Sequence, residues 1–180
     1  MIFHQILIVL SISVIILLHE KMELLKKITD LIFGTKSVKN NFSTNYPGEK
    51  ILASDASKGF RTEQEEDIKY GSNWTTSQRA IIILTDKRIK CGQWEIRLDE
   101  IENAKLVKVS SMFIPVYILK LKTTNKGYFQ FGMQMNQEWV NQTVLPLELE
   151  EGKLKYSYFS LAIRIFIIAY LVHWIIKRFF

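Results

Sequence analysis

Residues 79–92 read RAIIILTDKRIKCG, and this stretch decides the fold class. Its first half is apolar and β-branched, which favours an extended strand over a helix. Thr85, Asp86 and Lys87 then supply turn residues before the chain returns through a second short apolar segment,. The stretch therefore predicts a β-hairpin, and it indicates that the middle of the chain is a β-rich domain.

Further short strands are predicted on both sides of this hairpin. A first strand begins at residues 49–53, and the polar residues 54–76 are expected to form a long loop with an acidic cluster,. After the hairpin, alternating or β-branched segments predict more strands, at residues 94–98, 104–109, 116–122 and 128–131,. Asn136 is then placed to cap a helix that carries Trp139, before Pro146 discourages its continuation.

This order of elements predicts an α+β fold, a small β-barrel of about six to seven antiparallel strands capped by one helix. A closed sheet has no exposed edges, and the helix can plug one open end. The predicted domain spans residues 46–150, and residues 35–45 are expected to link it to the N-terminal segment.

Two apolar runs flank this domain, at residues 2–18 and 158–176. A bilayer core needs about 20 apolar helical residues to cross it. The sequence therefore predicts a C-terminal transmembrane helix over residues 157–178, despite Arg164. It also predicts an N-terminal anchor over residues 1–34 that continues as an amphipathic helix, and it leaves open whether residues 2–18 span the bilayer or lie at its interface. The basic residues beside the runs predict an integral membrane protein whose domain is cytoplasmic.

The ordered motifs resemble the GRAM and bacterial PH-like domain family. They are a "GE-x-I" opening at residues 48–51, an apolar strand that ends in "LTDKRI" at residues 84–89, and a corner at residues 96–101. The two strands at residues 117–131 and the helix follow in the order that the family shows. The resemblance covers about residues 46–147, and it implies a PH-like, membrane-held binding module.

Composition restricts the classes of function. The chain has 180 residues, one cysteine and three histidines. Since His4, His19 and His173 all lie in or beside the apolar runs, the middle of the chain offers no imidazole for acid-base chemistry,. No metal site or cofactor is predicted, and the chain is not expected to be an enzyme. The net charge of +6 is divided between the middle of the chain and the flanks of the apolar runs, and this distribution argues against nucleic acid as a partner,.

The sequence thus predicts a non-enzymatic scaffold that binds a protein or a lipid headgroup at the cytoplasmic membrane face. Membrane lipids, a membrane protein or a second copy of the chain are the expected partners. The alternative is a lipid-handling protein that binds an acyl chain or headgroup where the barrel meets the membrane. The candidate headgroup or partner contacts are Lys87, Arg88 and Lys90.

Two further expectations concern the electrostatics of this region. Arg88 is expected to pair with a carboxylate such as Asp99 or Glu100. Basic residues also occur around the segment after the first strand, but acidic residues are interleaved with them, which makes phosphoinositide binding there doubtful. The basic residues are Lys58, Arg61, Lys69 and Arg79, and the acidic ones are Glu63, Glu65, Glu66 and Asp67.

Overall fold

The computed structural model describes residues 27, 28, 30–70, 72–111, 114–153, 155, 156 and 158–179. The chain divides into two compact units, Met1–Lys50 and Ile51–Phe180. In the first unit, residues 35–45, predicted as a linker, form helix α2 (Thr35–Asn45) after Gly34, whose φ of 61° suits glycine,. The Phe42 ring stacks on Tyr46 at the end of this helix, with 4.7 Å between the ring centroids.

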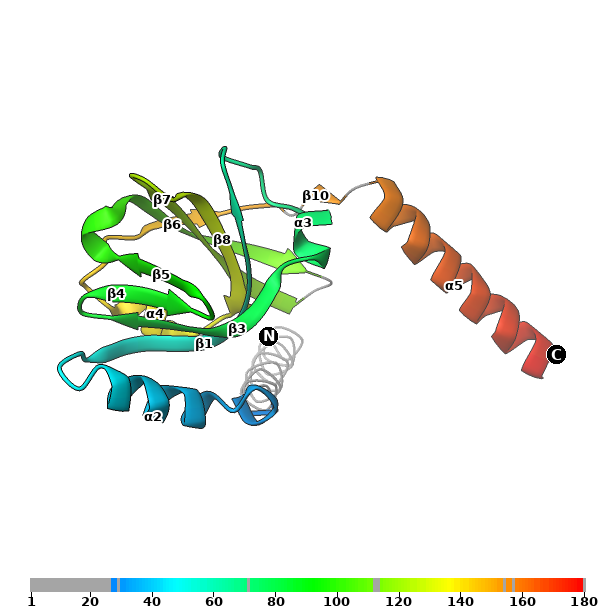
Figure 1. Cartoon of the computed structure of the whole chain (residues 1–180). Helices are drawn as coiled ribbons and strands as arrows, with labels where there is room; N and C mark the ends of the chain where they lie inside the picture. The colour runs from blue at the N-terminus through cyan, green and yellow to red at the C-terminus, as the bar shows by residue number, and fades with distance from the viewer. Residues whose placement is uncertain are drawn as a thin grey trace, which may run out of the picture. The chain divides into compact units, whose positions relative to one another are not determined.

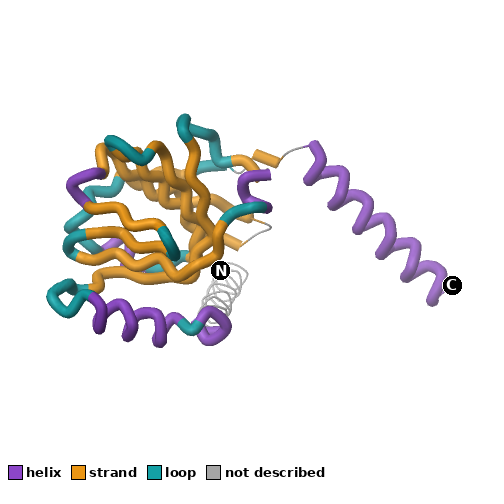
Figure 2. Tube along the Cα trace, in the orientation of Figure 1, coloured by secondary structure: helices purple, strands orange, loops and turns teal. Residues whose placement is uncertain are grey.

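The second unit is built on one curled sheet of eight strands in the order β5-β4-β3-β1-β8-β7-β6-β9 (Figure 1). Its strands are β1 (Ile51–Thr62), β3 (Gln78–Thr85), β4 (Arg88–Cys91), β5 (Trp94–Arg97), β6 (Ile101–Ser111), β7 (Ile114–Thr123), β8 (Gly127–Gln134) and β9 (Glu148–Glu151). The strands β2 (Lys69–Tyr70) and β10 (Lys155–Tyr156) form a separate parallel pair. The helices of this unit are α3 (Ser72–Thr75), the 3₁₀ turn η1 (Leu98–Glu100), α4 (Gln137–Asn141) and α5 (Tyr158–Phe179), and Figure 2 shows how strands dominate its secondary structure.

The hairpin predicted from residues 79–92 is confirmed as β3 and β4. Thr85 is fully buried and fixes the turn between them. Its Oγ1 accepts hydrogen bonds from the backbone nitrogens of Lys87, at 3.1 Å, and Arg88, at 3.0 Å. A threonine that satisfies two backbone donors in this way holds the register of the hairpin.

Strand β1 is longer than predicted and includes the first part of the expected loop. Residues 53–57 are small or polar, yet all of them are buried: β1 pairs with β3 along this stretch, and on its other side the side chain of Asn136 donates to the carbonyl oxygen of Ser54 at 3.0 Å. The hydroxyl of Ser57 donates to the carbonyl oxygen of Ala80 at 2.9 Å, which satisfies one of these buried groups,. The prediction that residues 54–62 form a loop is therefore wrong.

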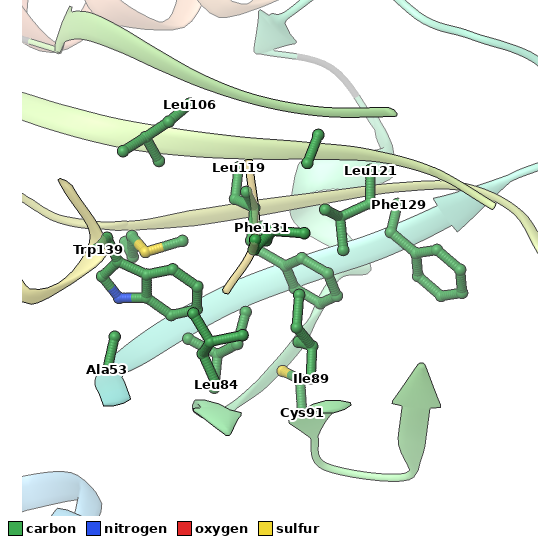
Figure 3. Packing of buried hydrophobic residues seen from close by; sticks show 14 of the residues in the cluster. Ala53, Leu84, Ile89, Cys91, Leu106, Leu119, Leu121, Phe129, Phe131 and Trp139 are labelled. Carbon is green, nitrogen blue, oxygen red and sulfur yellow. The ribbon is translucent and has the colours of Figure 1, made fainter. Parts of the chain in front are cut away.

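The main core lies on the inner face of the sheet (Figure 3). Phe131, Leu119 and Trp139 are completely buried there, and Phe129 stacks beside Phe131 with 6.0 Å between the ring centroids. Trp139 comes from α4, whose predicted cap is confirmed: the side chain of Asn136 accepts from the backbone nitrogen of Glu138 at 3.0 Å,. The aromatic residues of the strands therefore serve mainly in packing.

The predicted six to seven antiparallel strands in a closed barrel are wrong. The sheet has eight strands, and the described strands at its two ends, β5 and β9, do not pair with each other. β9 also pairs with β6 in parallel, which a meander does not produce. The acidic sequence of β9 gives no strand signal, because its four side chains are all exposed and need no alternation of polar and apolar residues,.

The predicted transmembrane helices are overturned as well. The C-terminal apolar run does form a helix, α5, but no helix in the described part of the chain is both long and apolar enough to cross a membrane. The predictions of flanking membrane helices and of an integral membrane protein are therefore wrong. Arg164 and His173 interrupt the run, and ionisable groups of this kind are costly within a bilayer,. The predicted anchor over residues 1–34 lies mostly outside the described residues.

We predict that Gly59→Ala destabilises the sheet by about 2 kcal/mol, the usual cost of overpacking a dense core. A Cβ at Gly59 would overlap Cδ1 of Phe131 and lie 3.2 Å from Cζ3 of Trp94. The matched control is Gly48→Ala, because a Cβ there meets nothing within 4 Å. Urea denaturation followed by circular dichroism measures both free energies of unfolding, and equal stabilities of the two variants would contradict the prediction.

Candidate ligand-binding site

The predicted contact residues Lys87, Arg88 and Lys90 lie on β4 and in the turn before it, and two of them pair with one carboxylate of β5. On β4 and β5, Arg88 hydrogen-bonds Oε1 of Glu95 through Nη1, and Nζ of Lys90 lies 3.4 Å from the other carboxylate oxygen. Partial burial alone would raise the pKa of Glu95, but the hydrogen bond and charge of Arg88 outweigh it and the pKa is lowered. Glu95 is therefore ionised at neutral pH and offsets one of the two positive charges, and Lys87 is exposed in the turn.

The predicted partner of Arg88 is also wrong. Its carboxylate is Glu95, which faces it from the adjacent strand, and not Asp99 or Glu100. Asp99 instead accepts from Nη2 of Arg97 at 2.6 Å, and Glu100 lies 2.6 Å from Nζ of Lys126. The sequence alone does not distinguish these carboxylates, because the choice depends on the register of β4 against β5.

The segment between β1 and β3 packs on the outer face of the sheet. Ile68 and Trp74 contact a small second cluster formed by Val107, Val109 and Ile118. The Trp74 ring also lies over Gly132 on β8, where a Cβ would approach it to 2.9 Å. The residues predicted as a solvated excursion therefore cover part of a strand face.

Three lysines, Lys105, Lys120 and Lys122, lie on the same face around a hollow of about 200 Å³. Each of them is paired with a carboxylate. The distances from Nζ to the carboxylate oxygen are 2.8 Å for Lys105 and Glu150, 2.8 Å for Lys120 and Glu65, and 2.6 Å for Lys122 and Glu102. The charge of this lysine group is thus largely offset by the chain itself.

The acidic residues after β1 are directed toward partners of their own. Glu63 pairs with Arg61 at 2.8 Å, and Oε2 of Glu66 accepts from Nδ2 of Asn73 at 2.8 Å. Glu65 reaches across to Lys120, whose hydrogen bond and charge lower the pKa of this carboxyl. The segment is further held by Gln130, whose Nε2 donates to the carbonyl oxygen of Glu66 at 2.8 Å.

A third basic pair, Lys58 and Arg79, differs from the other two groups. The two residues are directly opposite each other on β1 and β3, where side chains lie about 5 Å apart at Cβ,. Among the residues that the structure describes, neither has a carboxylate partner. Partial burial, and then the charge of Arg79, lower the pKa of Lys58. These two cations therefore face each other without a carboxylate partner among the described residues.

Sequence reasoning named Lys58 and Arg79 only as two of four basic residues among carboxylates, and it considered phosphoinositide binding there doubtful. The interleaved carboxylates made this region look neutral, whereas the structure turns Glu63, Glu65 and Glu66 toward other partners. The sequence shows the two basic residues themselves. Whether a carboxylate lies beside them depends on the path of the segment that follows β1, which the sequence does not show.

Comparisons with known proteins give no family assignment. No family model and no curated protein match the chain. One similar solved structure is the C-terminal domain of an unknown protein from Leishmania infantum, with 16% identity, coverage of 59% of this chain and 89% of that one, and a TM-score of 0.36. Another is the Vps36 N-terminal PH domain, with 20% identity, coverage of 55% and 78%, and a TM-score of 0.36.

The predicted PH-like resemblance thus has a counterpart among solved structures. At a TM-score of 0.36, however, the likeness carries no argument about function. The GRAM assignment stays a prediction, because no family model matches.

We predict that Glu65→Gln loosens the segment over residues 63–68 at neutral pH, because it removes the ion pair with Lys120. In the unchanged chain the same contact is present above the unfolded pKa of Glu65, near 4.5, and is lost as the pH falls through the lowered folded pKa,. Amide hydrogen exchange, corrected for the intrinsic rate at each pH, measures both effects. Glu63→Gln is the control, since its side chain is 81% exposed and pairs only with nearby Arg61. Unchanged exchange in Glu65→Gln would contradict the role of this contact.

Proposed function

We propose that the chain is a non-enzymatic binding module whose Lys58 and Arg79 pair holds an anionic group, such as the phosphate of a lipid headgroup. The observation that carries the proposal is the pair of directly opposed cations without a carboxylate among the described residues. Like charges in this arrangement destabilise a sheet. A bound anion offsets that repulsion. The free energy of binding therefore includes both the new contacts with the anion and the loss of repulsion between the two cations.

The chemistry of the two side chains suits phosphate. The planar guanidinium of Arg79 can donate two parallel hydrogen bonds to phosphate oxygens, and the ammonium of Lys58 adds a compact charge. Both side chains extend from strands that are paired along their length, so their backbones are already positioned before a ligand arrives. The ring of Trp74, from α3, lies over Gly132, the residue of β8 that pairs with Lys58.

The other basic groups support the choice of this pair. At β4 and in the lysine hollow, an incoming anion must first compete with a carboxylate of the chain, Glu95 in the first case and Glu65 in the second. At Lys58 and Arg79 no such competition is needed. The proposal includes no membrane anchor, and it concerns the anionic group alone.

The alternative of an acyl-chain site is not supported by a specific observation. The space on the inner face of the sheet is filled by side chains such as Phe131, Leu119 and Trp139, which are completely buried. It therefore stays a prediction from the sequence.

We expect Lys58→Gln and Arg79→Gln each to weaken binding of inositol 1,4,5-trisphosphate about tenfold, since hydrogen bonds between charged groups contribute about 1.5–3 kcal/mol. Isothermal titration calorimetry at low salt measures the affinity. Lys87→Gln is the matched control, because it removes the same charge from an exposed lysine in the turn between β3 and β4. An equal loss in the control would show diffuse attraction and contradict a defined site.

The source of the anion is distinguished by comparing probes. Sedimentation with vesicles of phosphatidylcholine containing phosphatidylinositol 4-phosphate tests a lipid headgroup, and inorganic phosphate tests a free anion. Binding of the vesicles that is lost in Lys58→Gln supports the headgroup, whereas binding of inorganic phosphate alone limits the site to small anions. Absence of binding to all three probes would overturn the proposal.

A further inference from the structure

The edge of the eight-stranded sheet beside β6 is covered by a short acidic strand of the chain itself. β9 pairs in parallel with the middle of β6, so that Glu148 is opposite Lys105 and Glu151 is opposite Lys108. Two ion pairs hold Lys105, with Nζ at 3.3 Å from Glu148 and 2.8 Å from Glu150. The pairing ends at Gly152, whose backbone nitrogen donates to the carbonyl oxygen of Lys108 at 2.9 Å.

The attachment of β9 relies on its backbone and on surface charges. All four of its residues are exposed, and Leu149, its one apolar residue, is 61% exposed. Exposed ion pairs contribute little to stability, and a short edge strand without a buried side chain opens at low free-energy cost. Leu145, three residues before β9, is buried, so the chain before β9 stays attached when β9 itself leaves.

β6 offers more edge than β9 uses. β6 runs from Ile101 to Ser111, whereas β9 pairs only with residues 105–108. In the described part of the chain no strand pairs with this edge outside residues 105–108, and an unpaired strand edge is a template for an added strand because its backbone donors and acceptors lack a ladder partner,. Lys105 and Lys108 give the edge a basic character, which selects an acidic strand.

A hollow beside the start of β6 extends this surface. It measures about 440 Å³ and is lined largely by apolar side chains, among them Leu98, Ile101 and Leu145. In a strand that runs parallel to β6, the residue before the acidic ones would lie beside this hollow. The surface therefore fits an extended segment that has an apolar residue followed by alternating or consecutive acidic residues.

We infer that the β6 edge is a docking site for an extended acidic segment of a partner protein, and that β9 occupies this site in the isolated chain. The partner strand runs parallel to β6 and replaces β9. It gains over β9 by pairing with the residues of β6 that β9 leaves open. This inference is independent of the proposed anion site, because Lys58 and Arg79 lie on other strands.

The test uses the full chain and a fluorescent peptide with the sequence of residues 144–153, VLPLELEEGK. Glu148→Lys, Glu150→Lys and Glu151→Lys, combined in one variant, place β9 against Lys105 and Lys108 with like charge and so expose the edge. We expect fluorescence anisotropy to show at least tenfold tighter binding of the peptide to this variant than to the unchanged chain. Adding Lys105→Gln to the variant should weaken that binding, while adding Lys58→Gln should leave it unchanged.

Two controls decide between the outcomes. A peptide with proline in place of Glu150 should not bind, because the backbone nitrogen of this residue, two before the donating nitrogen of Gly152, faces β6 and proline has no N–H there,. Hydrogen exchange at residues 105–108 reports whether the edge has opened in the variant. Open amides without peptide binding would overturn the inference, and so would amides that stay protected, because β9 would then not be displaceable. A variant that dimerises and excludes the peptide would show that the occupant is a second copy, which also overturns it.

Discussion

The pairing of β1 with two neighbours is the constraint on which the rest of the sheet depends. β1 pairs with β3 over residues 51–59 and with β8 over residues 57–62, so the two ladders overlap for three residues only. At this overlap Gly59 lets Phe131 and Trp94 approach the backbone closely. β1 thus pairs with β3 along its first part and with β8 along its last part. This change of partner joins the two halves of the curled sheet around the inner core,.

The same overlap places the proposed anion site. Lys58 is one of the three residues paired on both sides, and its position opposite Arg79 follows from the register that buries Ile81, Ile82 and Ile83 on β3. A slip of one residue would separate the two charges, but it would also exchange the two buried faces of β3 and remove Ile82 and Leu84 from the inner core,. Burying the apolar side chains of β3 stabilises the sheet by more than the repulsion between these two cations destabilises it. The register that buries β3 is therefore kept, although it places Lys58 and Arg79 opposite each other.

The sequence predicted those parts of the structure that depend on local patterns. The turn at Thr85, the cap at Asn136 and the packing of the aromatic strand residues all follow from neighbouring residues. It failed where pairing across the sheet overrides local character: residues 54–57 look like a loop but are buried in β1, and the acidic strand β9 has no apolar pattern at all. For the same reason the sequence did not predict that Arg88 pairs with Glu95 or that Lys58 has no carboxylate partner among the described residues. Both features depend on the positions of carboxylates that are distant in the sequence or on another strand.

The distribution of carboxylates gives the two proposed surfaces different physical characters. Lys105 and Lys120 are each matched by glutamates from segments that come from other parts of the chain, β9 and the loop after β1. A ligand at the β6 edge must therefore imitate and replace an acidic strand, and its affinity rests on backbone pairing with charge as the selector. At the proposed site of Lys58 and Arg79 no carboxylate among the described residues has to be replaced, so we expect affinity there to rest on charge and to fall steeply with salt,. The two proposed sites would thus bind different ligands without competition. The lysines at the β6 edge are paired with glutamates of the chain, whereas Lys58 and Arg79 have no carboxylate partner among the described residues.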